Sequence, residues 1–524
     1  MVISSGICKY SAERKSFSSY IFGPFNVFIH LYSINERVRR LKASRLCKTN
    51  WGDAGENLSK SIAVQEKLVR SLTLVPAASV ILANIIGTGV FVKARVMTCN
   101  VGTPGMVLTV WLVAGLLTLC GALVYAELGA MLPRSGGEFH YIGRAFGRRM
   151  GFLYGWTKTI ALGASAAALA IVFVVFLNDL LGGTLPPVAV QFLPLLVIAF
   201  ATGMNLLSAR SNGFTATVLT GVKIALVLFV GLGAFLLADG NWGNFSLGGA
   251  GGTCEGVPDS AKLGVSGFGA AMLGALWGYN GWSVISSVGG EIKNPGRTIP
   301  RALIGGTLSV IVLYLFVNAA YFYVLSPIEV ASVAESSSVA NEAASKFFGP
   351  WVAALMSAGL MISAYGTLHT TILTGPRVPF ALARAGLLPA GLAHISANGV
   401  PAVAILIVSS WSVVLSVSGT FDILTDMYIF ILWIFFGLNG AAVMVLRYRM
   451  PDAERPYRVW GYPYVPVIFL MVTLYLLINT LVATPARALG GIGLIIIGLP
   501  VYEYFLRRAG SVIPPFWRPG DKDD

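Results

Sequence analysis

The sequence predicts an all-α polytopic membrane protein with twelve membrane spans. Three observations lead to this fold class: 56% of the 524 residues are apolar, only 11% are charged, and the mean hydropathy is +0.75. A soluble domain carries about 25% charged residues, and a soluble surface this poor in charge would aggregate. These figures exclude a cytosolic enzyme, a secreted disulfide scaffold and a disordered chain.

The first part of the chain differs from the rest. Residues 1–65 are predicted to form a basic, poorly ordered cytoplasmic extension, ahead of a twelve-helix domain over 66–508 and a cytoplasmic tail over 509–524. Residues 1–70 hold 12 Lys and Arg against 5 Asp and Glu, half of the net charge of +14. Two interpretations stand side by side: a tail that lies on anionic lipid, or residues read from an upstream start codon that carry no function.

Twelve apolar segments follow, each long enough to cross about 30 Å of hydrocarbon as a helix. They lie over residues 72–96, 106–131, 151–179, 187–208, 214–238, 264–289, 301–325, 350–375, 401–419, 421–446, 462–484 and 488–507. With the N-terminus inside, the cytoplasmic junctions hold fourteen Lys and Arg and the opposite junctions five at most. Because Lys and Arg accumulate in cytoplasmic loops, both termini are predicted to be cytoplasmic, and the charge does not indicate nucleic-acid binding.

Two of these segments are interrupted by paired glycines. The first span contains the run 85–91 (IIGTGVF), and the sixth contains 277–282 (WGYNGW). Each glycine costs about 1 kcal/mol relative to alanine inside a helix, so both runs predict unwound backbone at mid-membrane. The two spans occupy matching positions if spans 1–5 and 6–10 form inverted repeats, and such matched interruptions indicate a transporter's binding site. The alternative is that the glycines only allow close helix packing.

Unwound backbone at the bilayer centre offers free peptide groups to a zwitterion such as an amino acid. The amides of Gly87, Thr88 and Gly89 and the Thr88 hydroxyl suit a carboxylate. The carbonyls of Ile85, Trp277 and Asn280 suit an ammonium group. The predicted substrate-binding residues are Ile85, Ile86, Gly87, Thr88, Gly89, Trp277, Gly278, Tyr279 and Asn280.

Lys223 lies midway along the fifth span, too far from its start to reach a headgroup easily. We expect its ammonium to hold the unwound backbone of the first span in place of a sodium ion, or to release a proton during transport. Glu127 and Glu291, at the inner ends of two spans, are predicted either to pair with arginines in an inner gate or to form ordinary surface ion pairs.

The remaining motifs exclude several kinds of site. The five cysteines have no metal-binding spacing, so neither a metal site nor a cofactor is predicted. Cys99 and Cys254 are both predicted on the outer side, and the sequence does not decide whether they form a disulfide bond. The chain lacks HExxH, GxSxG and phosphate-loop motifs, so it is predicted not to be an enzyme.

The interrupted spans and their flanking loops carry a family resemblance. The runs 86–91 (IGTGVF), 125–138 (YAELGAMLPRSGGE), 277–302 (from WGYNGW to GEIKNPGRTIPRA), 377–386 (RVPFALARAG) and 455–463 (RPYRVWGYP) resemble motifs of the amino acid–polyamine–organocation (APC) superfamily, in its L-type amino acid transporter branch. The resemblance covers about residues 66–508. It implies a LeuT-type fold of two inverted five-helix repeats plus two extra helices, and sodium-independent amino acid transport by alternating access, as exchanger or proton symporter.

The resemblance also assigns roles to residues. Lys223 matches the family's lysine in the fifth helix, and Trp277 stands where an aromatic side chain closes over the substrate as a gate. Asn280 stands where an Asp would favour cationic substrates, so neutral L-amino acids are expected. Residues 182–187 lack the cysteine that bonds a heavy chain in animal relatives, so a prokaryotic-type transporter of the inner membrane without that partner is expected. An amino-acid sensor or a channel-like protein on the same scaffold is the alternative.

Overall fold

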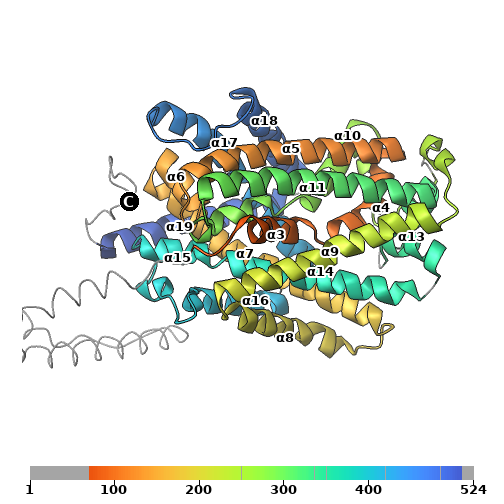
Figure 1. Ribbon diagram of the computed structural model, residues 1–524, viewed down its shortest axis with the longest axis horizontal. Helices are drawn as coiled ribbons and strands as arrows, with labels where there is room; N and C mark the ends of the chain where they lie inside the picture. Colours follow the sequence, from red (N-terminus) through yellow and green to blue (C-terminus); the bar gives the residue numbers. More distant parts are fainter. Residues whose placement is uncertain are drawn as a thin grey trace, which may run out of the picture. The chain divides into compact units, whose positions relative to one another are not determined.

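The computed structural model describes residues 70–248, 251–334, 337–349, 351–418, 421–483 and 485–509. The predicted extension over residues 1–65 lies outside this range, as does the tail beyond residue 509. The described residues are helical and contain no strand; they include two isolated backbone bridges, Leu72 with Ile292 and Ser135 with Val288. The long helices run alongside one another (Figure 1).

The first half of the described chain holds the helices up to the second glycine-rich run. They are α3 (Leu74–Ile85), α4 (Gly89–Val101), α5 (Pro104–Met131), α6 (Glu138–Phe146), α7 (Arg148–Leu180), α8 (Pro187–Asn205), α9 (Ala209–Leu237), the 3₁₀ turns η2 (Trp242–Ser246) and η3 (Asp259–Ala261), and α10 (Gly264–Gly278). Local chemistry starts several of them. The Thr103 hydroxyl accepts from the Met106 amide and caps α5, and Ser208 caps α9 in the same way.

The second half follows from the second run to the end of the described chain. It contains η4 (Trp282–Ser287), η5 (Gly289–Glu291), α11 (Pro295–Val324), α12 (Pro327–Ser332), α13 (Val339–Phe348), α14 (Val352–Thr374), α15 (Arg377–Arg384), η6 (Ala390–Ala393), α16 (Ala402–Ser418), α17 (Phe421–Arg449), α18 (Tyr464–Ala483) and α19 (Pro485–Ala509). The predicted helix boundaries shift by a few residues. The larger difference is beyond the second glycine-rich run, where two 3₁₀ turns stand in place of the rest of the span predicted over 264–289.

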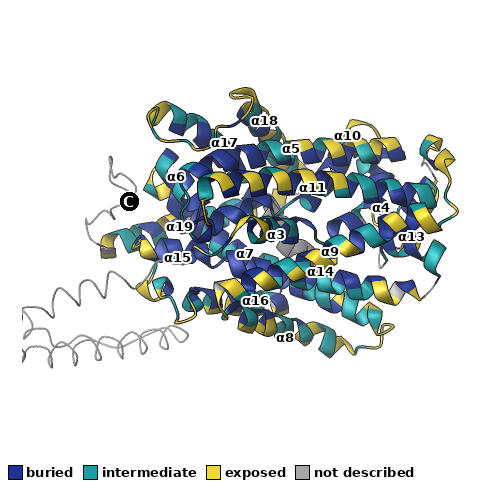
Figure 2. Ribbon diagram, in the orientation of Figure 1, coloured by how far each residue is buried: buried dark blue, intermediate teal, exposed yellow. Residues whose placement is uncertain are grey.

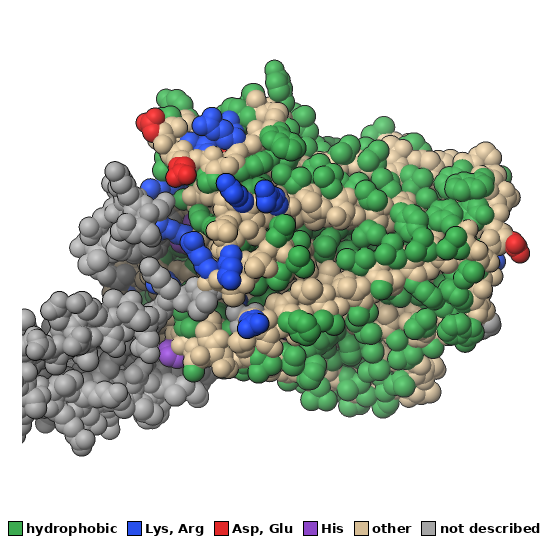
Figure 3. Space-filling view, in the orientation of Figure 1, with side chains coloured by type: hydrophobic (Ala, Val, Ile, Leu, Met, Phe, Trp, Pro, Cys, Tyr) green, Lys and Arg blue, Asp and Glu red, His purple; other side chains and the backbone are tan. Residues whose placement is uncertain are grey.

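Eight of the described helices are long and apolar enough to cross a membrane: α5, α7, α8, α9, α11, α17, α18 and α19. Their outer faces carry exposed apolar side chains such as Leu196, Phe200 and Ile478, whereas their inner faces are buried (Figure 2). On the side drawn in Figure 3, apolar side chains cover most of the surface and Lys and Arg gather towards the end that holds α6 and α15. This surface is that of a protein solvated by lipid.

The short helices α3 and α10 each pack against at least one long helix, and α4 packs chiefly against α10. α10 packs along α4, and α11 packs along both α3 and α5. On the other side α14 packs along α7 and α9, and it also contacts α3. α3, which ends at the first break, is therefore flanked by the long helices α11, α9 and α14.

Candidate functional site

The first interrupted span breaks over residues 86–88. α3 ends at Ile85 and α4 begins at Gly89, so the chain is not helical across the Gly-Thr-Gly run. A Cβ at Gly89 would lie 3.0 Å from the Cα of Gly278 and 3.0 Å from Cζ3 of Trp277. A larger residue at position 89 would have to push these neighbours away, so the glycine favours the close approach of the start of α4 to the end of α10.

The second interrupted span breaks immediately after α10. Gly281 has a φ of +116°, and a Cβ there would lie 2.6 Å from the carbonyl carbon and oxygen of Asn84. Both the left-handed backbone and this contact require glycine. The two breaks thus touch at two points, Gly89 with Gly278 and Asn84 with Gly281.

Tyr314 of α11 joins the two breaks. Its hydroxyl lies 2.9 Å from the carbonyl oxygen of Ile85 and 3.0 Å from that of Gly278, the last residues of α3 and α10. The side chain is fully buried, and its ring packs edge-on against Trp111. The Ile85 carbonyl is predicted to bind an ammonium group. In this structure it already accepts hydrogen bonds from the Tyr314 hydroxyl and from the Gly87 amide.

A cavity, called here the junction cavity, opens beside the two breaks. Its described lining consists of Asn84, Ile85, Gly87, Thr88, Gly89, Ser165, Ala168, Leu169, Val172, Trp277, Gly278, Asn280 and Thr367. Seven of the nine predicted binding residues are brought together here. The other two, Ile86 and Tyr279, are buried in the apolar core instead, where the Tyr279 hydroxyl donates to the Trp111 carbonyl.

One wall of the junction cavity, supplied by α7 and α14, lies outside the predicted site. Ser165, Ala168, Leu169 and Val172 recur at the spacing of one face of α7. That spacing was readable from the sequence, but nothing local indicates which other helix the face meets. None of the described lining residues is charged, and hydroxyl, amide and backbone groups supply all its polar contacts.

Lys223 approaches the first break from α9. Its Nζ donates to the Ala83 carbonyl at 2.6 Å and to Thr367 Oγ1 at 2.7 Å, and its side chain is 1% exposed. Ala83 belongs to the last turn of α3, whose carbonyls lose their helical partners where the helix stops. The lysine therefore replaces part of the missing hydrogen bonding at the end of α3.

Trp277 forms one wall of the junction cavity. Its ring contacts the Gly89 backbone, and Lys93 Nζ lies 5.0 Å from the ring centroid, one turn further along α4. A cation over an indole face is held by the ring's quadrupole. The indole is thus fixed to α4 on one side while it borders the cavity on the other.

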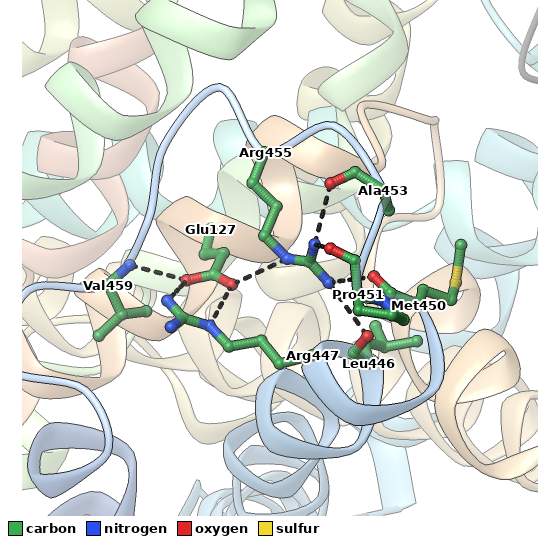
Figure 4. Close-up of polar contacts among 8 residues, drawn as sticks. All are labelled: Glu127, Leu446, Arg447, Met450, Pro451, Ala453, Arg455 and Val459. Atoms are coloured by element: carbon green, nitrogen blue, oxygen red, sulfur yellow. Dashed lines mark hydrogen bonds and ion pairs between the residues drawn. The ribbon is translucent and has the colours of Figure 1, made fainter.

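Glu127 lies outside the cavity, in a dense ion-pair cluster (Figure 4). Its carboxylate accepts from Arg447 at 2.9 and 2.6 Å and from the Val459 amide at 2.7 Å, and Arg455 Nε lies 3.5 Å away. Arg455 also donates to several carbonyls around the end of α17. One buried carboxylate therefore ties the end of α5 to the loop between α17 and α18.

Glu291 forms a second ion pair, which is completely enclosed. Arg377 donates to its two carboxylate oxygens at 2.8 and 3.2 Å, with 0% and 2% of the two side chains exposed. Arg377 also contacts the Leu373 carbonyl. The Glu291 backbone carbonyl accepts from the Leu72 amide at 2.9 Å, so the stretch before α3 is tied to the stretch after η5.

Cys99 of α4 and Cys254 form a disulfide bond with Cα atoms 5.7 Å apart. Neighbouring contacts attach the same loop to α4: Arg95 donates to the Glu255 carbonyl at 2.7 Å, and the Leu263 amide donates to the Asn100 carbonyl at 2.7 Å. The pairing that the sequence left open is therefore present. In the described part of the chain no cluster of His, Cys, Asp or Glu could hold a metal ion.

Known proteins resemble this chain over most of its length. Residues 72–497 match the family model described as amino acid permease. The chain is 31% identical to the serine/threonine exchanger SteT of Bacillus subtilis over 85% of this chain and 98% of that protein. It is 30% identical to b(0,+)-type amino acid transporter 1 of mouse (80% and 84%) and to large neutral amino acids transporter small subunit 2 of rabbit (83% and 80%).

The chain belongs to the amino acid permease family. The family match begins just before α3 and ends within α19, so it includes both interrupted spans and every residue that lines the junction cavity. The predicted membership of the APC superfamily is thereby confirmed. Family membership and the eight apolar helices make the chain a multi-pass membrane protein of a transporter family.

Proposed function

We propose that this protein exchanges neutral L-amino acids across the cell membrane, independently of sodium, by alternating access to the junction cavity. One observation carries the proposal: the only described polar groups around that cavity are uncharged and include the backbone of two broken helices. Backbone amides and carbonyls recognise the constant part of an amino acid, and Asn280 with its neighbours offers no charge to a charged side chain. The 31% identity to a serine/threonine exchanger favours exchange over proton symport.

The contacts of Lys223 support sodium independence. Its ammonium lies between the Ala83 carbonyl and the Thr367 hydroxyl, the kind of oxygen pair that a sodium ion would bind. A fixed positive charge there repels a second cation at the same point. The proposed role of Lys223 is therefore to support the first break permanently, without a coupling ion.

The proposed architecture is LeuT-type, with twelve spans. The four spans beyond the eight apolar helices are α3 with α4, α10 with η4, α14, and α16. Both termini would lie in the cytoplasm by the distribution of Lys and Arg, in the inner membrane of a prokaryotic-type cell. The Cys99–Cys254 bond supports this orientation, because disulfides persist on the oxidising side of a membrane. A heavy chain bonded through residues 182–187 is not expected.

The first test is exchange in proteoliposomes. Vesicles loaded with unlabelled L-serine should take up external labelled L-serine, and empty vesicles should take up little. L-threonine and L-leucine should compete, L-lysine and L-glutamate should not, and choline in place of sodium should change nothing. Absence of flux with every internal amino acid would overturn the proposal.

The other outcomes have distinct signatures. Uptake that requires a proton gradient and ignores internal amino acid would replace exchange by symport. Conductance without stoichiometric exchange would indicate a channel-like protein, and saturable binding without flux would indicate a sensor.

The second test removes the Lys223 ammonium. A hydrogen bond to a charged group is worth about 1.5–3 kcal/mol, so Lys223→Ala should lower exchange by roughly ten-fold or more while the protein stays folded. Lys262→Ala is the matched control, because Lys262 is paired with exposed Asp259 away from the cavity. Exchange at the wild-type rate in Lys223→Ala would refute this role.

A further inference from the structure

A second cavity lies where the last turn of α7 meets the start of α13 and the first half of α14. Its lining includes Phe176, Asp179, Asn341, Trp351, Ser357 and Leu360. We call it the vestibule cavity. α13 also packs against α4, the helix that carries Cys99, so the vestibule cavity lies towards the end of the molecule that holds the disulfide bond.

The vestibule cavity continues the same helix faces that line the junction cavity. On α7, Ser165, Leu169 and Val172 line the junction cavity, and Phe176 and Asp179 line the vestibule cavity. Steps of three and four residues keep all five on one face of the helix. Val172 and Phe176 are four residues apart, a rise of about 6 Å.

The facing helix repeats this pattern. On α14, Thr367 lines the junction cavity, and Leu360 and Ser357, seven and ten residues earlier, line the vestibule cavity. α7 and α14 pack against each other over much of their length. The two cavities are therefore successive openings along one seam between two helices.

The chemistry of the vestibule cavity differs from that of the junction cavity. Asp179 brings a carboxylate, and no ion pair to it occurs in the described part of the chain. The end of α7 adds the partial negative charge of a helix C-terminus. Asn341 adds an uncharged amide side chain to the lining. Asp179 therefore gives the vestibule cavity a negative charge, which the junction cavity lacks.

A primary ammonium group complements this charge. It carries three N–H donors and one positive charge, which a carboxylate such as that of Asp179 accepts. A carboxylate-bearing ligand without an amino group would instead be repelled by Asp179.

We propose that the vestibule cavity is a second binding site for the ammonium group of an amino acid, occupied before the substrate reaches the junction cavity, with Asp179 as its counter-ion. This inference rests on the proposed function, since it requires an amino acid substrate. It assigns to Asp179 a role in capture from the disulfide side alone: the carboxylate raises the local concentration of the ligand and plays no part in the binding at the two breaks.

The test measures labelled L-serine uptake from each side of the membrane by the full-length chain. Influx into intact cells reports on the disulfide side, and uptake by inside-out vesicles reports on the opposite side. Because an exposed charge pair contributes modestly, Asp179→Asn should raise the KM for influx by roughly two- to five-fold with the maximal rate unchanged. The KM for uptake by inside-out vesicles should stay at the wild-type value.

Two further variants sharpen the result. Asp179→Glu keeps the charge and should restore the wild-type KM. Asp239→Asn removes an exposed carboxylate that follows α9 and does not line the cavity, and it should change neither KM. Equal KM values for Asp179→Asn and wild type, or an equal rise from both sides, would overturn the vestibule site. Absence of L-serine flux in the wild type would instead overturn the proposed function.

Discussion

The two ends of the helix bundle are held together by different kinds of contact. At the ion-pair end, the buried carboxylates of Glu127 and Glu291 hold Arg447, Arg455 and Arg377. At the disulfide end, α4 is attached by a covalent bond and by hydrogen bonds to the 254–263 loop. Ion pairs can separate and form again, whereas the disulfide bond keeps α4 and its loop together in every conformation. Under the proposed alternating access, the ion-pair end would open by separation of these pairs, and α4 and its loop would move as one unit.

The largest expected effect comes from the Glu291–Arg377 pair. Glu291→Met should lower the free energy of unfolding by about 3–5 kcal/mol, because it leaves the Arg377 charge buried without a partner. The double variant Glu291→Met/Arg377→Met should be more stable than the single one. Denaturant unfolding in detergent micelles measures the stability of both variants. A single variant as stable as wild type would show that the Glu291–Arg377 pair does not stabilise this end of the bundle.

The disulfide bond should come next. Cys99→Ser should cost about 2–4 kcal/mol, because the bond closes a loop between residues 155 apart in sequence. Cys99→Ser/Cys254→Ser should cost the same as the single change, since the bond is lost only once. Cys120→Ser, at a cysteine that forms no disulfide within the described chain, is the control. If reduction and substitution leave the unfolding midpoint unchanged, α4 is held by its hydrogen bonds alone.

Between the two ends, Tyr314 holds the breaks themselves. Tyr314→Phe should cost about 1–3 kcal/mol, because it removes the donor to the buried carbonyls of Ile85 and Gly278. Tyr321→Phe is a matched control two turns along α11, since the Tyr321 hydroxyl is buried with no hydrogen-bond partner among the described residues. It should be nearly neutral. Equal losses for the two variants would show that the hydrogen bonds of the Tyr314 hydroxyl add no stability beyond that of an unpartnered hydroxyl.

The smallest effect concerns an ion pair on the surface. Burial acts to raise the pKa of Glu329, but hydrogen bonds from Ser326 and Lys346 outweigh it and leave the pKa below its ordinary value of 4.5. A lowered carboxyl pKa stabilises the fold above pH 4.5, and this contribution is lost as pH falls through the lowered value.

Both side chains of this pair are nearly half exposed, at 45% for Lys346 and 46% for Glu329. Glu329→Gln should therefore cost less than about 1 kcal/mol at neutral pH. The difference from wild type should vanish in acid, and stability curves against pH measure it. A loss as large as that of Glu291→Met would contradict the contrast between buried and exposed pairs.

The sequence predicted local features better than distant ones. The breaks at Gly87–Gly89 and at Gly278–Gly281 could be predicted because the paired glycines that disfavour the helix lie within the broken segments themselves. The contact of Lys223 with the first span could be predicted because a charge inside an apolar helix needs a nearby partner. The contacts of Tyr314 could not, because a tyrosine in an apolar helix does not indicate which carbonyls its hydroxyl will meet.

Two of the predicted binding residues, Ile86 and Tyr279, do not line the junction cavity, and the cause is related. Both lie in the unwound runs, and each run is predicted as a whole to belong to the site. A non-helical segment between packed helices turns some of its side chains towards the core. Ile86 and Tyr279 are 0% exposed and pack there, while their neighbours face the cavity.

Thr367 has a consequence beyond its place in the cavity wall. The same hydroxyl that borders the junction cavity also receives the Lys223 ammonium and lies 3.2 Å from the Ala83 carbonyl. A molecule that hydrogen-bonds to Thr367 in the cavity would therefore contact the same hydroxyl that binds the lysine beside the end of α3. One atom thus links the contents of the cavity to the hydrogen bonds that hold the first break.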